Sequence, residues 1–389
     1  MTNFDIPVNR RGTNSYKWDS APEEGILPLW VADMDFRTAP AVTEALRKRV
    51  EHGVFGYTHV PDTFYEATIN WFGQRHHWQI EREWMLYTSG VVPAISAVIK
   101  GLTTPGDKVL VQTPVYNCFF SSIRNNGCLM EENRLVYEDC YYRIDFEDFE
   151  RKAADPAVKL FLLCNPHNPA GRVWTAEELR RMGEICRRHG VIVVSDEIHG
   201  EFTFPGYTYV PFASASATCL HNSVTCTSPS KAFNTAGLQI ANIICDNAAW
   251  RQKIDRAIND NEVCDVNPFG IEGLIAAYTE GGEWLDELKA YLFGNYNFLY
   301  SYFEERLPDF PVLRMEGTYL AWVDCRCLRL TSAEVEEQLL GQEKVWVNAG
   351  SLYGEAGEGF IRINMACPRS SLTEGLQRIE RGLQRLKNI

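Results

Sequence analysis

The sequence lacks any apolar run that approaches the about 20 residues needed to cross a bilayer. Its first residues, 1–7, lack the charged and then apolar pattern of a signal peptide. Basic charge is also scarce, because 38 Lys and Arg residues stand against 51 Asp and Glu residues, a formal net charge of −13. We therefore expect a cytoplasmic protein that binds neither membranes nor nucleic acid.

Cysteine pairs with the spacing of metal ligands are missing too. The 12 cysteines are scattered through a long chain, and Cys325 and Cys327 have no second pair that would complete a zinc site. Four others lie in apolar runs, which is typical of reduced core residues: Cys164, Cys186, Cys226 and Cys245. We expect no metal site.

Length and composition indicate a globular protein with more than one domain. The 389 residues are 45% hydrophobic and 23% charged, which predicts two or three domains. We expect a large domain at 45–285, a smaller α+β domain at 286–389, and an N-terminal arm at 1–44 that joins the small domain. Within the arm, residues 30–36 are expected to lie across either a partner subunit or their own domain.

Strands and helices alternate through the larger domain. A capping box formed by Thr175 and Glu178 predicts a helix that ends at His189 and Gly190. Apolar runs predict strands at 108–111, 158–164, 191–194, 224–227 and 239–245. Near-continuous apolar strands separated by helices predict an α/β fold with a mostly parallel sheet, covered by helices on both faces.

Polar side chains follow the ends of four strands, where parallel sheets bind ligands: Tyr116, Asn168, Asp196 and Lys231. Lys231 lies among small and hydroxylated residues, where partial burial lowers the pKa of an amine. Neighbouring hydroxyls and backbone amides suit a phosphate. An amine beside a phosphate pocket is what a covalent link to pyridoxal phosphate requires. The alternative is a solvated surface lysine.

Five residues have a possible role in such a site and an ordinary structural alternative. Asp196 fits an acid at the pyridine nitrogen, or it caps a helix. Asn168 fits a contact to the ring hydroxyl, or it forms an Asx turn. Tyr116 stacks on the ring or packs in the core. Arg362 grips a substrate carboxylate with its planar fork, or it is an exposed strand charge. His199 supports the ring hydroxyl or is structural.

A glycine turn precedes the helix predicted after residue 90. The run Ser89-Gly90-Val91-Val92 places free N–H groups and the positive end of a helix dipole at one spot, which favours an anion. The same pattern occurs in many ordinary turns.

Five stretches carry a family resemblance. They are Trp-Val-Ala-Asp-Met-Asp-Phe (30–36), Asn-Pro-His-Asn-Pro-Ala-Gly (165–171), Ser-Asp-Glu-Ile-His (195–199), Ser-Pro-Ser-Lys-Ala-Phe-Asn (228–234) and Arg-Ile-Asn-Met-Ala-Cys-Pro-Arg (362–369). In this order and spacing they closely resemble the MalY/PatB-type carbon–sulfur β-lyases, which have the aspartate-aminotransferase fold (PLP fold type I). The resemblance spans essentially the whole chain.

The resemblance implies a role for each candidate. Lys231 links to the cofactor aldehyde, Asp196 partners the pyridine nitrogen, and Tyr116 covers the ring. Asn168 contacts the ring hydroxyl and, with Arg362, the substrate, whose α-carboxylate Arg362 holds. The remaining cofactor contacts are Gly90, Val91, Val92, Ser228 and Ser230 around the phosphate, His199 near the ring, and Tyr57, which reaches the phosphate of the neighbouring subunit in a homodimer.

Two positions depart from the family pattern. Many aminotransferases of this fold place an arginine on the phosphate shortly after the lysine, but no Arg or Lys occurs from Ala232 to Trp250. Gln239 lies where that charge is expected, so the phosphate must rely on amides and hydroxyls. Ala232 replaces a threonine of the family.

The activity implied by the resemblance is α,β-elimination. Lys231 takes the Cα proton, and the C–S bond of L-cystathionine or another S-substituted cysteine breaks to give a thiol, pyruvate and ammonia. Two alternatives stay open, namely an aminotransferase and a PLP-binding regulator that acts through protein contacts. The preferred leaving group depends on pocket shape, which the sequence does not specify.

Overall fold

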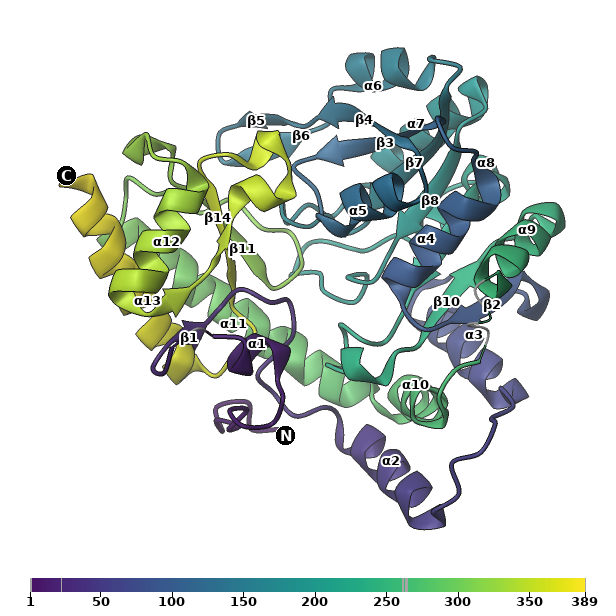
Figure 1. The fold of residues 1–389 in the computed structure, drawn as a ribbon, viewed down its shortest axis with the longest axis horizontal. Coiled ribbons are helices and arrows are strands. Elements are labelled where there is room, and N and C mark those ends of the chain that lie inside the picture. Colours follow the sequence, from purple (N-terminus) through teal and green to yellow (C-terminus); the bar gives the residue numbers. More distant parts are fainter. Residues whose placement is uncertain (1, 22, 261, 263–264, 389) are drawn as a thin grey trace.

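A seven-stranded sheet forms the centre of the larger part of the molecule (Figure 1), in a computed structural model that describes residues 2–21, 23–260, 262 and 265–388. Residues 1 and 389, the outer limits of the expected domains, lie outside the described residues. The strands are β2 (Met85–Thr88), β3 (Lys108–Thr113), β4 (Leu129–Arg134), β7 (Val158–Cys164), β8 (Ile192–Asp196), β9 (Ser223–Thr227) and β10 (Ala241–Ile244). Their order is β2-β10-β9-β8-β7-β3-β4.

This sheet is mostly parallel, which confirms the predicted fold class. Only β10 runs antiparallel to its neighbours, and every other pairing in the sheet is parallel. The strand predicted at 158–164 has the expected bounds, whereas those at 191–194 and 239–245 are Ile192–Asp196 and Ala241–Ile244. The carboxyl ends of β3, β7, β8 and β9 therefore meet at one edge.

Helices cover both faces of the sheet, because side chains alternate along each strand. Leu160 and Leu162 of β7 belong to one buried cluster with residues of α4 (Val91–Leu102), α5 (Cys118–Asn125) and α9 (Ala248–Asn259). Phe161 and Leu163 belong to another with residues of α6 (Phe146–Ala153), α7 (Ala176–His189) and α8 (Ala217–His221). The predicted capping box of Thr175 begins α7.

A smaller antiparallel sheet lies beside the first (Figure 1), in the order β11 (Leu320–Asp324), β14 (Phe360–Asn364) and β13 (Asn348–Ala349). It is accompanied by α12 (Ser332–Glu343) and α13 (Arg369–Lys387). The N-terminal segment joins this part, since β1 (Leu27–Pro28) pairs in parallel with β12 (Val345–Trp346). The expected limit at 285 falls near the start of the long helix α11 (Gly282–Arg306).

The remaining elements are α1 (Tyr16–Asp19), α2 (Pro40–His52), α3 (Asp62–His76), α10 (Pro268–Glu280) and the hairpin of β5 (Val136–Glu138) and β6 (Tyr141–Arg143). Short 3₁₀ helices occur at Arg82–Trp84, Phe212–Ser214, Ala236–Leu238, Arg326–Leu328, Gly350–Tyr353 and Glu355–Gly357. Helix α2 and the chain that joins it to α3 lie at the periphery (Figure 1).

Three features bear on the first expectations from the sequence. A search of the described helices finds none with the length and apolar character of a membrane span. The described residues also hold no group of three or more His, Cys, Asp or Glu side chains placed to bind a metal ion. The four cysteines predicted as reduced core residues are buried free thiols, as expected: Cys164, Cys186, Cys226 and Cys245.

Candidate active site

A cavity of about 570 Å³ lies between the carboxyl ends of the parallel strands and the smaller sheet. This volume lies within the range of small-molecule sites. Its wall contains ten of the residues singled out from the sequence: Gly90, Val91, Val92, Tyr116, Asn168, Asp196, His199, Ser230, Lys231 and Arg362. Residues that follow the ends of parallel strands thus lie close together in the structure, as predicted, although they are far apart in the sequence.

Lys231 lies in a tight turn just after β9. The turn is closed by backbone hydrogen bonds from Phe233 to Pro229 and from Thr235 to Ser230, each of 2.9 Å. The Lys231 amine donates to the Ala32 carbonyl over 2.6 Å. Burial and, to a smaller extent, the charge of Arg362 together lower the pKa of this amine to about 8. About a tenth of the amine is therefore neutral, and nucleophilic, at pH 7.

Asp196 is the last residue of β8 and is 3% exposed. Its carboxylate accepts a hydrogen bond from the Ile198 N–H over 3.1 Å. Burial raises the pKa of Asp196 to about 7, against a partial lowering by that hydrogen bond. A buried carboxylate of this kind is stabilised by a cationic N–H partner, which the protonated nitrogen of a pyridine ring would supply.

Arg362 lies at the centre of the smaller sheet, opposite Trp322 on β11 and Asn348 on β13. Its guanidinium donates to the Asn168 side-chain oxygen over 3.2 Å and to the Trp30 carbonyl over 2.7 Å. The side chain is only 3% exposed, so it is no surface charge. Its Nε is buried without a partner, which leaves a donor available for a carboxylate inside the cavity.

Tyr116 and His199 are neutral side chains on the cavity wall. Burial raises the pKa of the Tyr116 phenol well above its usual value, and the Cys118 thiol adds to the effect. Burial lowers the pKa of His199 well below its usual value, with further lowering by Lys231 and Arg362. The Nδ1 atom of His199 is buried without a hydrogen-bond partner. Because buried polar atoms are normally hydrogen-bonded, this nitrogen leaves an unused hydrogen-bonding position at the cavity wall.

The start of α4 and the Lys231 turn form the predicted phosphate cradle. Gly90 is the N-cap of α4 and supplies no side chain to its free N–H groups. Ser230 lines the cavity. Ser228 lies behind this wall, where its hydroxyl donates to the Ile240 carbonyl over 2.7 Å and accepts from the Ser230 N–H over 3.1 Å. Gln239, which replaces the expected arginine, also lines the cavity.

Tyr57 lies outside the cavity of its own chain. It belongs to the segment between α2 and α3 and is fully exposed, with a relative accessibility of 102%. The structure contains one subunit, so the predicted contact of Tyr57 with a neighbouring site stays a prediction.

Several wall residues had not been predicted to contribute to the site. Residues 30–36 pack on their own chain, which confirms one of the two expected placements, and Trp30, Val31 and Ala32 line the cavity. Cys118 also lines it and had a signal, because it follows the same strand end as Tyr116. The Tyr353 ring lies 5.0 Å from the Arg362 guanidinium, at the end of the short 3₁₀ helix Gly350–Tyr353, which no sequence pattern marked.

The residues present fit pyridoxal phosphate. A reactive amine, a strand-end carboxylate with a raised pKa and an uncapped helix start line one cavity. The unpartnered nitrogen of His199 and the free donor of Arg362 add unused polar capacity. This combination is what a PLP site uses to hold the aldehyde, the ring nitrogen and the phosphate.

Comparison with known proteins agrees with this fold and site. The chain belongs to the aminotransferase class I and II family, whose family model matches residues 24–379. It is 43% identical to cystathionine beta-lyase PatB of Bacillus subtilis (strain 168), over 98% of this chain and 100% of that protein. It is 34% identical to Protein MalY of Escherichia coli (strain K12), over 97% of each chain. The predicted MalY/PatB-type resemblance is confirmed.

A solved structure extends the similarity to three dimensions. The crystal structure of cystalysin from Treponema denticola, which contains pyridoxal 5′-phosphate, has a TM-score of 0.96 to this chain at 34% identity and covers 100% of both chains. The predicted aspartate-aminotransferase-type fold is therefore confirmed over the whole length compared.

Proposed function

We propose that the chain is a PLP-dependent carbon–sulfur lyase. It cleaves the C–S bond of L-cystathionine or a related S-substituted cysteine by α,β-elimination, which yields a thiol, pyruvate and ammonia. The observation that carries the proposal is the joint placement of the Lys231 amine, with its pKa of about 8, and the buried Arg362 guanidinium in one cavity. The relative most similar in sequence among those described above is a cystathionine β-lyase.

The cofactor would be held by groups of the larger part of the molecule. Lys231 would bind its aldehyde, and Asp196 would stabilise a proton on the pyridine nitrogen. Tyr116 would pack on the ring, and Asn168 and His199 would offer polar contacts to the ring hydroxyl. The N–H groups at the start of α4 and the Ser230 hydroxyl would bind the phosphate. When bound, pyridoxal phosphate supplies the electron sink for the negative charge that develops at the substrate Cα.

Substrate recognition depends on Arg362. Its guanidinium is aligned by hydrogen bonds to Asn168 and Trp30 and has a free Nε donor. A planar fork of this kind binds an α-carboxylate through two parallel hydrogen bonds. This fixes the amino acid with its Cα toward the lysine, while the rest of the cavity accommodates the sulfur substituent.

Proton transfer is assigned to Lys231 and Tyr116. Because burial lowers its pKa to about 8, the Lys231 amine is able to take the Cα proton near neutral pH. The Tyr116 phenol, whose pKa is raised, starts the step protonated and would give its proton to the departing sulfur. The Lys231 ammonium would then return the proton taken from Cα to the Tyr116 phenolate, so that the net transfer is from Cα to sulfur.

The test is to mix the purified holoenzyme with L-cystathionine and to measure pyruvate and free thiol. Borohydride should remove the yellow absorption of the cofactor, and peptide mapping should place the resulting label on Lys231. Absence of turnover with cystathionine and with a panel of other S-substituted cysteines would contradict the proposal.

An aminotransferase is the second candidate, favoured by the family match itself. It would convert the cofactor to pyridoxamine phosphate in the presence of an amino donor, without release of thiol. A regulatory role is distinguished by Lys231→Ala, which should abolish lyase activity but leave protein contacts intact.

The enzyme is proposed to act as a cytoplasmic homodimer. Four apolar side chains are exposed at the end of α2 and on the segment that follows it: Val50, Val54, Phe55 and Tyr57. A second copy would cover them and bring Tyr57 to the neighbouring phosphate. Sedimentation should give a dimer, and Tyr57→Phe should weaken cofactor binding. The eleven described free cysteines fit a reducing compartment.

A further inference from the structure

Residues 30–36, which we call the strap, hold two cationic side chains of the cavity through backbone carbonyls. The Ala32 carbonyl accepts from the Lys231 amine over 2.6 Å and from the Tyr319 hydroxyl over 3.0 Å. The Trp30 carbonyl accepts from Arg362 over 2.7 Å and from Asn348 over 3.2 Å. Any shift of the strap therefore changes the position of both acceptors at once.

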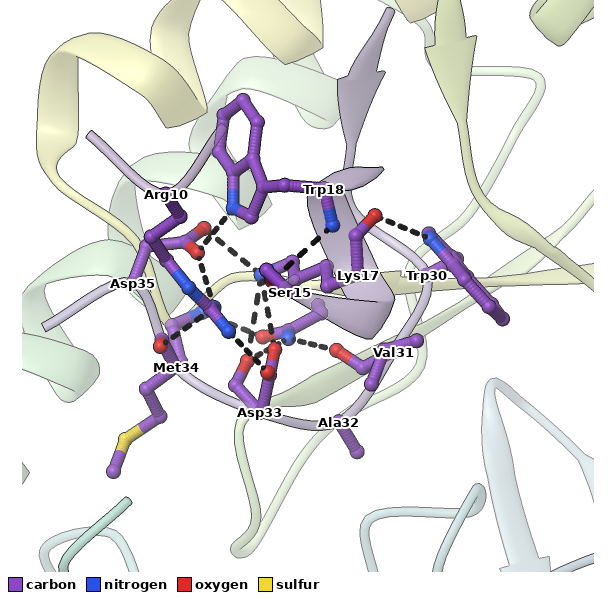
Figure 2. Close-up of polar contacts among 12 residues, drawn as sticks. Arg10, Ser15, Lys17, Trp18, Trp30, Val31, Ala32, Asp33, Met34 and Asp35 are labelled. Atoms are coloured by element: carbon purple, nitrogen blue, oxygen red, sulfur yellow. Dashed lines mark hydrogen bonds and ion pairs between the residues drawn. The ribbon is translucent and has the colours of Figure 1, made fainter. Parts of the chain in front are cut away.

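The strap is anchored by four charged side chains that we call the arm cluster: Arg10, Lys17, Asp33 and Asp35 (Figure 2). Lys17 lies 2.8 Å from Asp35 and 3.8 Å from Asp33. Arg10 lies 2.6 Å from Asp33 and 2.8 Å from Asp35. The Trp18 indole donates to Asp35 over 2.8 Å. All four members are described side chains that lie outside the cavity lining.

One charge pair of the arm cluster, Lys17 and Asp35, is buried, whereas the Arg10 and Asp33 side chains are partly exposed. Lys17 is 0% exposed and Asp35 is 5% exposed. Desolvation of two charges costs about as much as their attraction returns, so apolar residues of similar size usually serve stability as well or better. What a buried charge pair adds is discrimination between alternative registers, because any other register leaves a charge unpaired.

We propose that the arm cluster is a positioning device that sets the register of the strap, and with it the places of the Lys231 amine and the Arg362 guanidinium. Arg10 and Lys17 also donate to the strap backbone, at the Met34 carbonyl over 3.1 Å and at the Asp33 carbonyl over 3.3 Å. The same two side chains thus hold the carboxylates and the backbone of the strap. The inference rests on the proposed function, since it concerns the residues assigned to that reaction.

The device also acts on the charge of Lys231. A carbonyl acceptor stabilises an ammonium more than a neutral amine. The charged groups that act on this amine are Arg362, which lowers its pKa, and Asp33, Asp196 and Cys118, which raise it. A displaced strap removes the Ala32 carbonyl and the Asp33 charge together. The pKa of Lys231 should then fall below its present value of about 8.

The test uses the double variant Lys17→Met/Asp35→Leu, which removes one charge pair and replaces it with apolar groups. Lys108→Met is the matched control, because Lys108 also has two carboxylate partners, Asp155 at 2.7 Å and Glu131 at 2.9 Å, but lies far from the strap at the start of β3. For each holoenzyme, kcat, KM and Tm are measured. For each cofactor-free protein, acetic anhydride labelling of Lys231 at pH 7 is followed by peptide mass spectrometry.

We expect the double variant to lose about tenfold or more in kcat, with a Tm close to that of the parent. Lys231 labelling should be about threefold faster, the effect of half a pKa unit. The control should match the parent in kcat and labelling. A folded double variant with parental kcat and labelling overturns the proposal, as does slower labelling. If the double variant does not fold, Asp35→Asn is measured in the same way and judged by kcat and labelling, because loss of this buried carboxylate lowers Tm.

The two proposals fail separately. If the parent holoenzyme releases no pyruvate and thiol from any substrate, the lyase assignment is wrong, whereas faster labelling in the double variant still supports the positioning role. If the parent is an active lyase and the labelling is unchanged, only the positioning role is wrong.

Discussion

Lys17 and Lys231 both lie against the strap, and their charges are compensated in opposite ways. Lys17 is fully buried with a carboxylate oxygen at 2.8 Å, whereas the amine of Lys231 donates to a neutral carbonyl at 2.6 Å. In the arm cluster, the Lys17 ammonium is therefore compensated by the Asp35 carboxylate. On the cavity side, burial lowers the pKa of Lys231 to about 8. A buried lysine becomes a nucleophile where no carboxylate forms a direct pair with it.

Of the two lysines, substitution of Lys231 should have the larger effect on activity. Lys231→Met removes both the covalent link to the cofactor and the base that takes the Cα proton, so kcat for pyruvate release should fall about 10⁴-fold. The control is Lys108→Met, which should retain parental kcat. A Lys231→Met enzyme with more than a few per cent of parental activity would refute the role of this amine.

Substitution of the two lysines should change the free energy of unfolding in opposite directions. Lys17→Met leaves Asp35 buried with one partner fewer, which should lower the free energy of unfolding by about 3–5 kcal/mol. Lys231→Met should instead stabilise the cofactor-free protein near pH 7, by up to about 3 kcal/mol. The reason is that a pKa lowered in the folded state contributes stability above the unfolded pKa and loses it as pH falls through about 8.

Urea unfolding of the cofactor-free variants at pH 7 measures both effects. Equal destabilisation by the two substitutions would mean that Lys231 is compensated as fully as Lys17, and the comparison would fail.

The residues that line the cavity could be predicted from the sequence, whereas the arm cluster could not. Lys231, Asp196 and Asn168 each follow a buried strand, and the carboxyl ends of parallel strands share one edge. The apolar runs that predict strands, and the turn residues that end them, were enough to predict that Lys231, Asp196 and Asn168 lie close together. The burial of Lys17 depends instead on Asp35, 18 residues away across an irregular segment, and lysine is among the residues least often buried.

Ser228 shows a finer limit of the sequence reasoning. A hydroxyl beside the reactive lysine suits a phosphate chemically, and the motif alone does not say which way it turns. The structure has this hydroxyl bonded to the Ile240 carbonyl, where it fixes the turn. The orientation depends on a backbone acceptor 12 residues later, and no local propensity encodes that contact.

A smaller effect should distinguish the carboxylate of Asp196 from those of the arm cluster. Within the described residues, no Lys, Arg or His side chain forms an ion pair with Asp196, and burial raises its pKa to about 7. A raised carboxyl pKa gives stability that is present below the unfolded pKa and is lost as pH rises through about 7. Asp196→Asn removes this loss.

The cofactor-free Asp196→Asn protein should therefore gain stability over the parent as pH rises from about 5 to 8, by about 2 kcal/mol. Urea unfolding at the two pH values measures the difference. Asp35→Asn serves as the control, since it should destabilise at both values. A constant difference between Asp196→Asn and the parent would show that Asp196 ionises as freely in the fold as in the unfolded chain.

The smallest effect concerns Arg362, whose guanidinium donates to the strap at the Trp30 carbonyl but does not contact the arm cluster. Arg362→Lys keeps the charge but loses the planar fork, and with it the simultaneous contacts to Asn168 and Trp30. We expect KM for cystathionine to rise about tenfold, the loss of one charge-assisted hydrogen bond, with kcat changed less. Steady-state kinetics of pyruvate release measure both constants. If kcat falls and KM is unchanged, Arg362 acts on the reacting atoms and does not hold the substrate carboxylate. Lys231 and Arg362, the two side chains that donate to the strap, would then both act in the chemical step.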